Sequence, residues 1–111
     1  MNDDVAYKIL TTAQFAALQA GTFKGAPVDI ADGYIHLSSA AQLTGTVRRH
    51  FAGQEGLFVL AIGLSRLSVP VRWEVSRGGQ LFPHLYARLR MADVIAHTPL
   101  RWQDGAVLPP A

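Results

Sequence analysis

The sequence predicts a small α+β domain. Patterns typical of two amphipathic helices lie in the first half of the chain, and the second half consists mostly of short apolar or alternating segments typical of β-strands. Helices and strands do not alternate regularly, as they would in a parallel sheet built from β-α-β units. We therefore expect an α+β architecture rather than a doubly wound α/β fold.

Length and composition fit one domain. The chain has 111 residues, of which 50% are apolar and 16% are charged, and it has no cysteine. A chain of this size can bury a core without disulfides or metals, and its composition is not that of a disordered protein. We expect a single domain over 1–111, with a core over about 5–98 and a loose C-terminal tail over 103–111.

The charge pattern argues against extended binding of nucleic acid. The formal net charge is +2 and no basic run occurs, whereas non-specific binding neutralises many phosphates at once. The bias toward arginine over lysine still suits a few bidentate contacts to phosphate or carboxylate. No apolar run is long enough to cross a membrane, and the acidic N-terminus does not resemble a signal peptide. We expect a cytoplasmic protein.

A strand and a helix are expected first. The segment 5–10 alternates well enough for a strand. Thr11 and Gln14 then form the pattern of a capping box, in which a hydroxyl and an amide satisfy free N–H groups at the start of a helix. Gly21 is a natural C-terminal residue for that helix, because glycine adopts the left-handed conformation at little cost.

A second strand and helix follow. The segment 33–37 is expected as a strand that runs directly into a helix. Ser39 and Gln42 repeat the capping-box pattern at the start of that helix, and Gly53 ends it. The segment between the two helices contains turn signals around Pro27 and is expected to be irregular.

The remaining elements are expected to be strands. The continuous apolar run 57–62 is typical of a buried central strand. The segment 71–75 alternates, and 84–86 and 93–97 are expected as two shorter strands. Between them, the glycine-containing segment 76–79 is expected as a flexible loop.

The segment from Asp29 to Ser38 is the first candidate for a functional site. His36 is expected on a strand, two residues before Ser38 and close to a helix N-terminus. Free N–H groups at a helix N-terminus suit anions such as phosphate, and histidine can move a proton near neutral pH. A purely structural role, with Ser38 as a helix cap and His36 as a core histidine, is the alternative.

The segment from 72 to 86 is the second candidate. Arg72 and Glu74 share one strand face, which suits either an ion pair or the binding of a polar ligand. Arg77 precedes two glycines, so backbone and guanidinium could both approach a phosphate. His84 and Tyr86 alternate onto one strand face. A surface ion pair and a hairpin tip are the structural alternatives.

Several familiar catalytic patterns are absent from the sequence. It has no thiol, no GxSxG motif, no Walker loop and no GxGxxG motif. No pair of histidines has the helical spacing of a zinc protease. His36, Glu74 and His84 could together supply three ligands to a catalytic metal, which we keep as a third hypothesis behind a nucleotide-binding enzyme and a binding module.

The motifs together resemble those of a known family. The chain is identified as a member of the bacterial domain-of-unknown-function family 952, over residues 5–98 approximately. The matching motifs are Tyr7–Leu10, Gly25–Asp29, Asp32–Ser38, Arg72–Glu74 and Leu81–Tyr86. The resemblance implies an ADP-ribosyltransferase-like fold, in which a split, mostly antiparallel β-sheet with two helices from the N-terminal half holds NAD in a central cleft.

The resemblance also implies residue roles. His36 with Ser38 matches the first transferase motif, which binds the ribose and pyrophosphate side of NAD. His84 or Tyr86 matches the second motif, at the nicotinamide end. The third motif is an acidic residue near the last strands. Glu74 comes earlier than that pattern requires, and the acids after Tyr86 are Asp93 and Asp104.

The sequence has no acid that fits the third motif. We therefore also consider a branch of the ADP-ribosyltransferase superfamily that uses histidines and arginines instead of this acid. The RNA 2′-phosphotransferases belong to this branch and transfer a phosphate with NAD as acceptor. His36, Arg72, Arg77 and His84 are compatible with such chemistry, because guanidinium groups neutralise phosphate and a histidine carries a proton.

We therefore expect a protein that binds NAD or another small nucleotide-like ligand, with transfer of an ADP-ribosyl or phosphoryl group as its activity. The catalytic candidates are His36, Glu74 and His84, and the cofactor-binding candidates are Ser38, Arg72, Arg77 and Tyr86. The alternative is a non-catalytic module, for a small ligand or a protein, that has lost the acidic residue.

Overall fold

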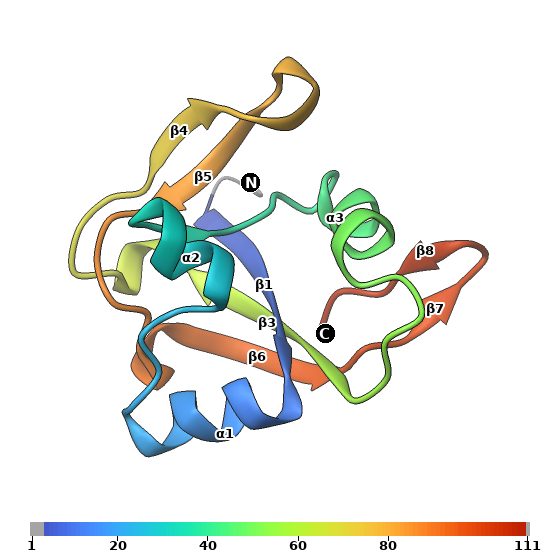
Figure 1. The fold of residues 1–111 in the computed structure, drawn as a ribbon, viewed down its shortest axis with the longest axis horizontal. Helices are drawn as coiled ribbons and strands as arrows, with labels where there is room; N and C mark the ends of the chain where they lie inside the picture. The colour runs from blue at the N-terminus through green and yellow to red at the C-terminus, as the bar shows by residue number, and fades with distance from the viewer. Residues whose placement is uncertain (1–3, 111) are drawn as a thin grey trace.

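The computed structural model describes residues 4–110, which form two antiparallel sheets of three strands each and a separate hairpin (Figure 1). The first sheet has the order β1–β3–β6, formed by Val5–Thr11, Leu57–Gly63 and Val94–Pro99. The second sheet has the order β2–β5–β4, formed by Ile35–His36, Leu81–Leu85 and Arg72–Val75. The expected α+β class with antiparallel sheets is confirmed.

The two sheets meet at one point. Tyr7 in β1 and Ser38, just after β2, form an isolated antiparallel bridge, with N···O distances of 2.8 and 2.9 Å. Directly after β2 the chain therefore reaches the edge of the first sheet, and two backbone hydrogen bonds hold it to β1. This bridge fixes the position of β2 and its histidine relative to β1.

The expectation for the 57–62 run is confirmed, because β3 lies in the centre of its sheet. All its residues except Phe58 are buried, so the strand needs apolar side chains on both faces. The expected strand over 84–86 is longer and begins earlier, at Leu81, so that Tyr86 lies just beyond its end.

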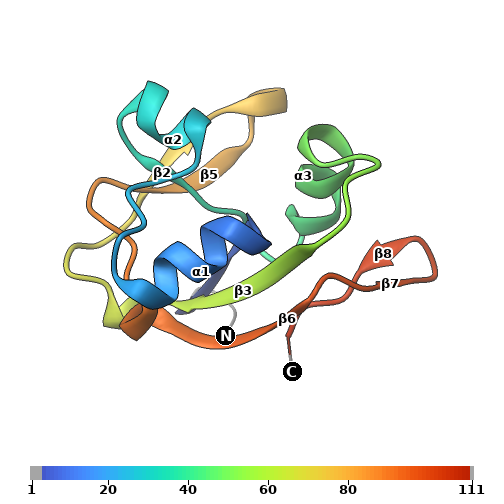
Figure 2. The same ribbon diagram turned by 60° about the horizontal axis from the view of Figure 1, so that its bottom comes forward.

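The described residues form three α-helices, where the sequence suggested two. The first, α1 (Thr12–Ala20), begins with the predicted capping box of Thr11 and Gln14 and ends at Gly21, whose φ is 79°. It packs against β1 and β3 through Phe15 and Leu18. Figure 2 shows the helix lying over these two strands.

The helix missed in the sequence is α2 (Pro27–Asp32), which lies beside β2 and β5. Pro27 at its start has a preset φ, and the Asp29 side chain accepts a hydrogen bond from the backbone N–H of Ala26 at 2.8 Å. With six residues, the helix is too short to show a 3.6-residue apolar period. The sequence therefore predicts the turns around this helix but not the helix itself.

The third helix, α3 (Leu43–His50), begins later than predicted. Half of the expected capping box forms: the Gln42 side chain accepts from the backbone N–H of Ser39 at 3.0 Å, but the Ser39 hydroxyl does not cap a helix. Residues 39–42 form a turn instead, so β2 does not run directly into the helix, and the prediction that Ser38 stands at a helix N-terminus is wrong.

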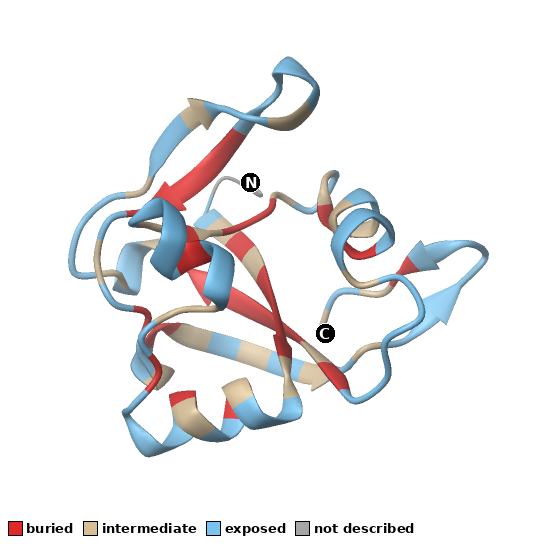
Figure 3. Ribbon diagram, in the orientation of Figure 1, coloured by how far each residue is buried: buried red, intermediate tan, exposed pale blue. Residues whose placement is uncertain are grey.

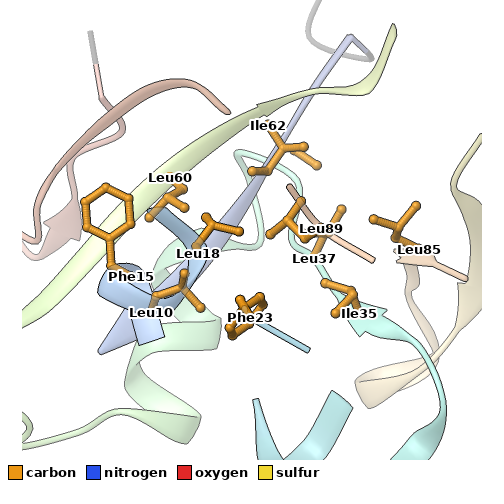
Figure 4. Packing of buried hydrophobic residues seen from close by; sticks show 11 residues of the cluster. Leu10, Phe15, Leu18, Phe23, Ile35, Leu37, Leu60, Ile62, Leu85 and Leu89 are labelled. Carbon is orange, nitrogen blue, oxygen red and sulfur yellow. The ribbon is translucent and has the colours of Figure 1, made fainter. Parts of the chain in front are cut away.

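The core has two clusters. The larger fills the space between α1 and the two sheets, and Figure 4 shows side chains that belong to it, among them Leu10, Phe15, Leu60, Ile62 and Leu85. Figure 3 shows that burial concentrates on β1, β3 and β5. The smaller cluster lies between β1, β3 and α3 and includes Val107.

The C-terminal segment differs from the expected loose tail. Strands β7 (Trp102–Gln103) and β8 (Ala106–Val107) form a hairpin that packs beside α3 (Figure 1). Val107 is only 5% exposed, and its backbone N–H donates to the Thr44 hydroxyl at 3.0 Å. The two strands have only two residues each, which is too short a pattern to predict this contact from the sequence.

The β4–β5 hairpin places its two faces in different surroundings. Arg72 and Glu74 of β4 lie on the same face as His84 of β5, because Arg72 pairs directly with His84. On the opposite face Trp73 is 42% and Val75 is 70% exposed. The predicted alternation is therefore present, and the polar face is the one that turns toward the candidate site.

Three short 3-10 helices complete the described chain: η2 (Leu64–Arg66), η3 (Arg77–Gly79) and η4 (Met91–Asp93). The segment predicted as a flexible loop after β4 contains η3, which connects β4 to β5. Asp93, expected at the start of a strand, instead ends η4. Within residues 4–110, no helix has the length and apolar character needed to cross a membrane.

Candidate functional site

An open cleft of about 740 Å³ lies between the two sheets and α3. In Figures 1 and 2, α2, β2 and β5 stand on one side of this region and α3 on the other. Charged and polar side chains from many parts of the chain line it, including Lys8, His36, Ser38, Arg49, Arg77 and His84. Four of the predicted site residues, His36, Ser38, Arg77 and His84, therefore share one cleft.

His36 is held between two carboxylates. Its Nδ1 lies 2.7 Å from Oδ1 of Asp29, and its Nε2 lies 2.9 Å from Oδ2 of Asp32. An imidazole ring donates hydrogen bonds from both nitrogens only when it is protonated. The geometry therefore describes a positively charged ring. Asp32 is half exposed at the end of α2, so a ligand could replace it more readily than the buried Asp29.

Asp29 anchors this arrangement from inside the protein. Its side chain is 1% exposed and accepts hydrogen bonds from Lys8 Nζ, from the His36 ring and from the backbone N–H groups of Ala26 and His36. Burial alone would raise the pKa of Asp29, but the hydrogen bond from His36 and the charge and hydrogen bond of Lys8 outweigh it, and the pKa falls to about 2.

Lys8 completes the buried ion pair. Its ammonium donates to Asp29 at 3.0 Å and to the backbone carbonyl of His36 at 2.9 Å. Burial lowers the pKa of Lys8, while the Asp29 carboxylate acts in the opposite direction. A buried pair of this kind costs desolvation, so its presence is weak evidence that it stabilises the fold.

His84 has one carboxylate partner. Its Nδ1 donates to Oε1 of Glu74 at 2.8 Å, and the same oxygen accepts from the Tyr86 hydroxyl at 2.7 Å. Hydrogen bonds from Tyr86 and His84 lower the pKa of Glu74. Nε2 of His84 has no hydrogen-bond partner among residues 4–110, and His84, although only 2% exposed, lines the cleft.

The two histidines belong to one aromatic cluster. Tyr34 stacks on His84 with ring centroids 4.2 Å apart and lies 4.6 Å from His36 and 5.1 Å from Tyr86. His36 and His84 are 5.5 Å apart. Burial and the charges of Asp32 and Glu74 raise the pKa of Tyr34, so its hydroxyl stays neutral at pH 7.

Ser38 has a different environment from the one predicted. Its hydroxyl lies 2.7 Å from the Thr46 hydroxyl of α3, and its backbone belongs to the bridge with Tyr7. Ser38 therefore contacts the side of α3 rather than the free N–H groups at its start. Ser38 nevertheless lines the cleft, together with His36 and His84.

Arg72, Glu74 and Tyr86 lie behind His84 rather than in the cleft lining. The Arg72 guanidinium stands 4.5 Å from the Tyr86 ring centroid, and Tyr86 contacts Glu74, which holds His84. The structure thus connects all three to the site through His84. A direct contact with a ligand in this cleft is open to His84 and not to Glu74.

The other acids considered for the third motif lie elsewhere. Asp93 is fully buried and pairs with Arg90 at 2.6 Å, and Asp104 occupies the β7–β8 turn. Among residues 4–110, no three or more His, Asp or Glu side chains form a group that could hold a metal ion. The third hypothesis therefore has no geometric support, because His36, Glu74 and His84 form no such group.

The comparisons decide the family. The model of the family described as Protein of unknown function (DUF952) matches residues 9–97. The chain belongs to this family. No curated protein matches the DUF952 chain.

Solved structures of one protein from Caulobacter crescentus, CC0527, are similar to this DUF952 chain. Its crystal structure is 40% identical, covers 94% of this chain and 93% of its own, and has a TM-score of 0.83. Its solution NMR structure is also 40% identical, covers 94% and 90%, and has a TM-score of 0.77. This likeness supports the fold and the family and carries no activity.

Sequence reasoning missed five residues of the DUF952 cleft or its anchor, namely Lys8, Asp29, Tyr34, Thr46 and His50. Asp29 and Tyr34 lie within the segment 29–38, which was predicted as a candidate site, but neither residue was assigned a role. His50 had no predicted role, yet it is exposed and lines the cleft. A lysine in an otherwise apolar strand was the one signal available for Lys8, since lysine is seldom buried without a partner.

Proposed function

We propose that this DUF952 protein binds NAD or another small nucleotide in the cleft, and that it transfers an ADP-ribosyl or phosphoryl group as an ADP-ribosyltransferase-like enzyme. The observation that carries the proposal is the juxtaposition of two histidines with different carboxylate partners in one cleft with Arg77. Paired titratable groups in unequal environments suit separate acid and base roles.

His84 is the better candidate for the proton carrier. Glu74 accepts a hydrogen bond from Nδ1–H, which leaves Nε2 of the neutral ring as an acceptor on a residue that lines the cleft. A ligand hydroxyl within hydrogen-bond distance of Nε2 could transfer its proton to it. Glu74 then acts as a positioning residue, because it orients the ring and stabilises the imidazolium that forms.

His36 suits a different role. Its ring carries both protons while it contacts Asp29 and Asp32, so it is a hydrogen-bond donor rather than a base. A ribose hydroxyl or phosphate oxygen that displaces the exposed Asp32 could accept the Nε2–H. This agrees with the role implied by the family resemblance, in which the first-motif histidine binds the ribose side of the nucleotide.

The position of Glu74 favours transfer that depends on histidine. Its carboxylate is occupied by His84 and Tyr86 and does not line the cleft, so it is poorly placed to polarise a ribose 2′-hydroxyl directly. Phosphoryl transfer needs positive charge and a proton carrier, and Arg77 and His84 offer both.

The test is a titration of the protein with NAD and with ADP-ribose, followed by NMR and calorimetry. We expect saturable binding that shifts the resonances of residues 34–38 and 84, with loss of about tenfold or more in affinity for His36→Ala. His97→Gln is the matched control, because His97 packs on Phe15 away from the cleft. Absence of binding at millimolar ligand, or equal binding by His36→Ala, would contradict the proposal.

A non-catalytic binding module is the second candidate, and the occupied Glu74 carboxylate favours it. Such a module would bind the nucleotide in the same cleft without changing it. Prolonged incubation with NAD, with nicotinamide release followed by chromatography, separates the two. Release that His84→Ala abolishes supports the enzyme, whereas binding without release supports the module.

A further inference from the structure

Two arginines at the α3 end of the cleft have no acidic partner. Arg49 of α3 and Arg77 of η3 both line the cleft. Within the part of the chain that the structure describes, residues 4–110, neither forms an ion pair. Lys8 and Arg90, in contrast, are each paired with a buried aspartate. The α3 end of the cleft therefore carries uncompensated positive charge.

Arg77 is held in place by neutral groups. Its Nη1–H donates to Nε2 of His50 at 2.9 Å, and its Nη2–H donates to the Thr46 hydroxyl at 3.4 Å. Its guanidinium also lies 4.9 Å from the Phe82 ring centroid. A guanidinium has five N–H donors, and these contacts use two of them. The others are available in a fixed orientation, which lowers the entropy cost of binding an anion.

His50 takes part as a neutral group. Nε2 can accept from Arg77 only when it carries no proton. Burial and the positive charges of Arg77, Arg49 and His36 lower the pKa of His50, in agreement with this form. The charge at this end of the cleft thus comes from the two guanidinium groups.

The other end of the cleft has the opposite character. Asp32 lines it beside His36, and His84, on which Tyr34 stacks, contributes an aromatic ring. A ligand that fits both ends has an anionic group at one end and a polar or aromatic body at the other. Two guanidinium charges match a dianion better than a singly charged diester.

We propose that Thr46, Arg49 and Arg77 form a subsite for a phosphomonoester, with the body of the ligand directed toward His36 and His84. The subsite rests on the proposed function in that the ligand occupies the same cleft. It goes beyond that function because it places a terminal phosphate at one end of the cleft. It also names the residues of α3 and η3 that bind this phosphate.

Calorimetry and amide NMR at low ionic strength test the subsite with four probes: inorganic phosphate, adenosine 5′-monophosphate, its methyl diester, and adenosine. We expect the monophosphate to bind about tenfold or more tightly than the diester or adenosine, and inorganic phosphate to shift resonances of residues 46–50 and 77. Arg77→Ala should lose this preference. Arg101→Ala removes the same charge from an exposed site outside the cleft and should keep it.

Equal affinity for monoester and diester, or equal loss in Arg77→Ala and Arg101→Ala, would overturn the subsite. If Arg77→Ala does not fold, Arg49→Ala provides the same comparison, because Arg49 is exposed. NAD binding that depends on His36, together with monophosphate binding that depends on neither Arg77 nor Arg49, would reject the subsite and leave the proposed function intact. Absence of binding by every phosphate probe and by NAD would reject both.

Discussion

His36 and His84 are direct partners across β2 and β5, and their ring centroids lie 5.5 Å apart. Their environments are nevertheless different, since His36 contacts two aspartates and His84 contacts one glutamate. The antiparallel register brings the rings together, and the carboxylates around them distinguish their roles. The consequences of this pairing can be measured.

Glu74→Gln should change the tautomer of His84. The carboxylate now accepts a hydrogen bond from Nδ1, which places the proton of the neutral ring on that atom. A glutamine can also present its N–H₂ to Nδ1, which allows the proton to move to Nε2. Nitrogen chemical shifts of the His84 ring report the tautomer directly. Tyr86→Phe is the matched control, because it removes a bond to Glu74 and leaves the Nδ1 contact.

Asp29→Asn should reduce the dependence of stability on acid pH. The pKa of Asp29 is about 2 in the folded protein, against an ordinary value of 3.8. Because the folded pKa is lowered, the stability that Asp29 contributes is present above about pH 4 and is lost as the pH falls toward 2. The difference corresponds to about 2 kcal/mol.

Urea unfolding at several pH values between 2 and 7 measures this contribution. The free energy of unfolding of the wild type should fall more steeply below pH 4 than that of Asp29→Asn. Asp104→Asn changes an exposed carboxylate in the β7–β8 turn and serves as control. Identical acid profiles for wild type and Asp29→Asn would show that Asp29 is not the group responsible.

The strands and the first helix were predictable because their signals are local. The Thr11 capping box and Gly21 bound α1, and the continuous apolar run of β3 reflects burial on both faces. The second helix, α2, was missed because six residues show no period. The start of α3 was misplaced because Gln42 supplied only half of the capping box.

The site was predictable in its residue types and less so in its connections. His36, Ser38, Arg77 and His84 were identified from segments that combine polar side chains with turns, and they line one cleft. The partners that hold them come from distant parts of the chain. Lys8 reaches Asp29 across 21 positions and Arg77 reaches Thr46 across 31, and no local pattern contains such contacts.

Val107→Ala should destabilise the protein although it lies near the C-terminus. Val107 is buried against Leu43 and Val47 of α3, so truncation removes apolar contacts and leaves a cavity. We expect a loss of about 1–3 kcal/mol in the free energy of unfolding. Val75→Ala, at an exposed position of β4, should change it by less than about 0.5 kcal/mol. Equal, small effects would mean that the C-terminal hairpin does not contribute to the core.

His50 should titrate below the usual range of histidine. Burial is the largest cause of its lowered pKa, followed by the charges of Arg77, Arg49 and His36. Of these, Arg77 also donates a hydrogen bond to Nε2, which only the neutral ring can accept. Protonation of His50 must therefore break this bond and place a third positive charge beside two guanidinium groups.

Arg77→Met should raise the midpoint of His50, because it removes both the charge and the hydrogen bond that favour the neutral ring. The midpoint should stay below that of a free histidine, since burial and Arg49 remain. Proton NMR of the imidazole ring between pH 4 and 8 gives both midpoints, and Arg101→Ala should leave the His50 midpoint unchanged. A His50 midpoint that Arg77→Met does not raise would mean that the Arg77–His50 contact is not maintained in solution.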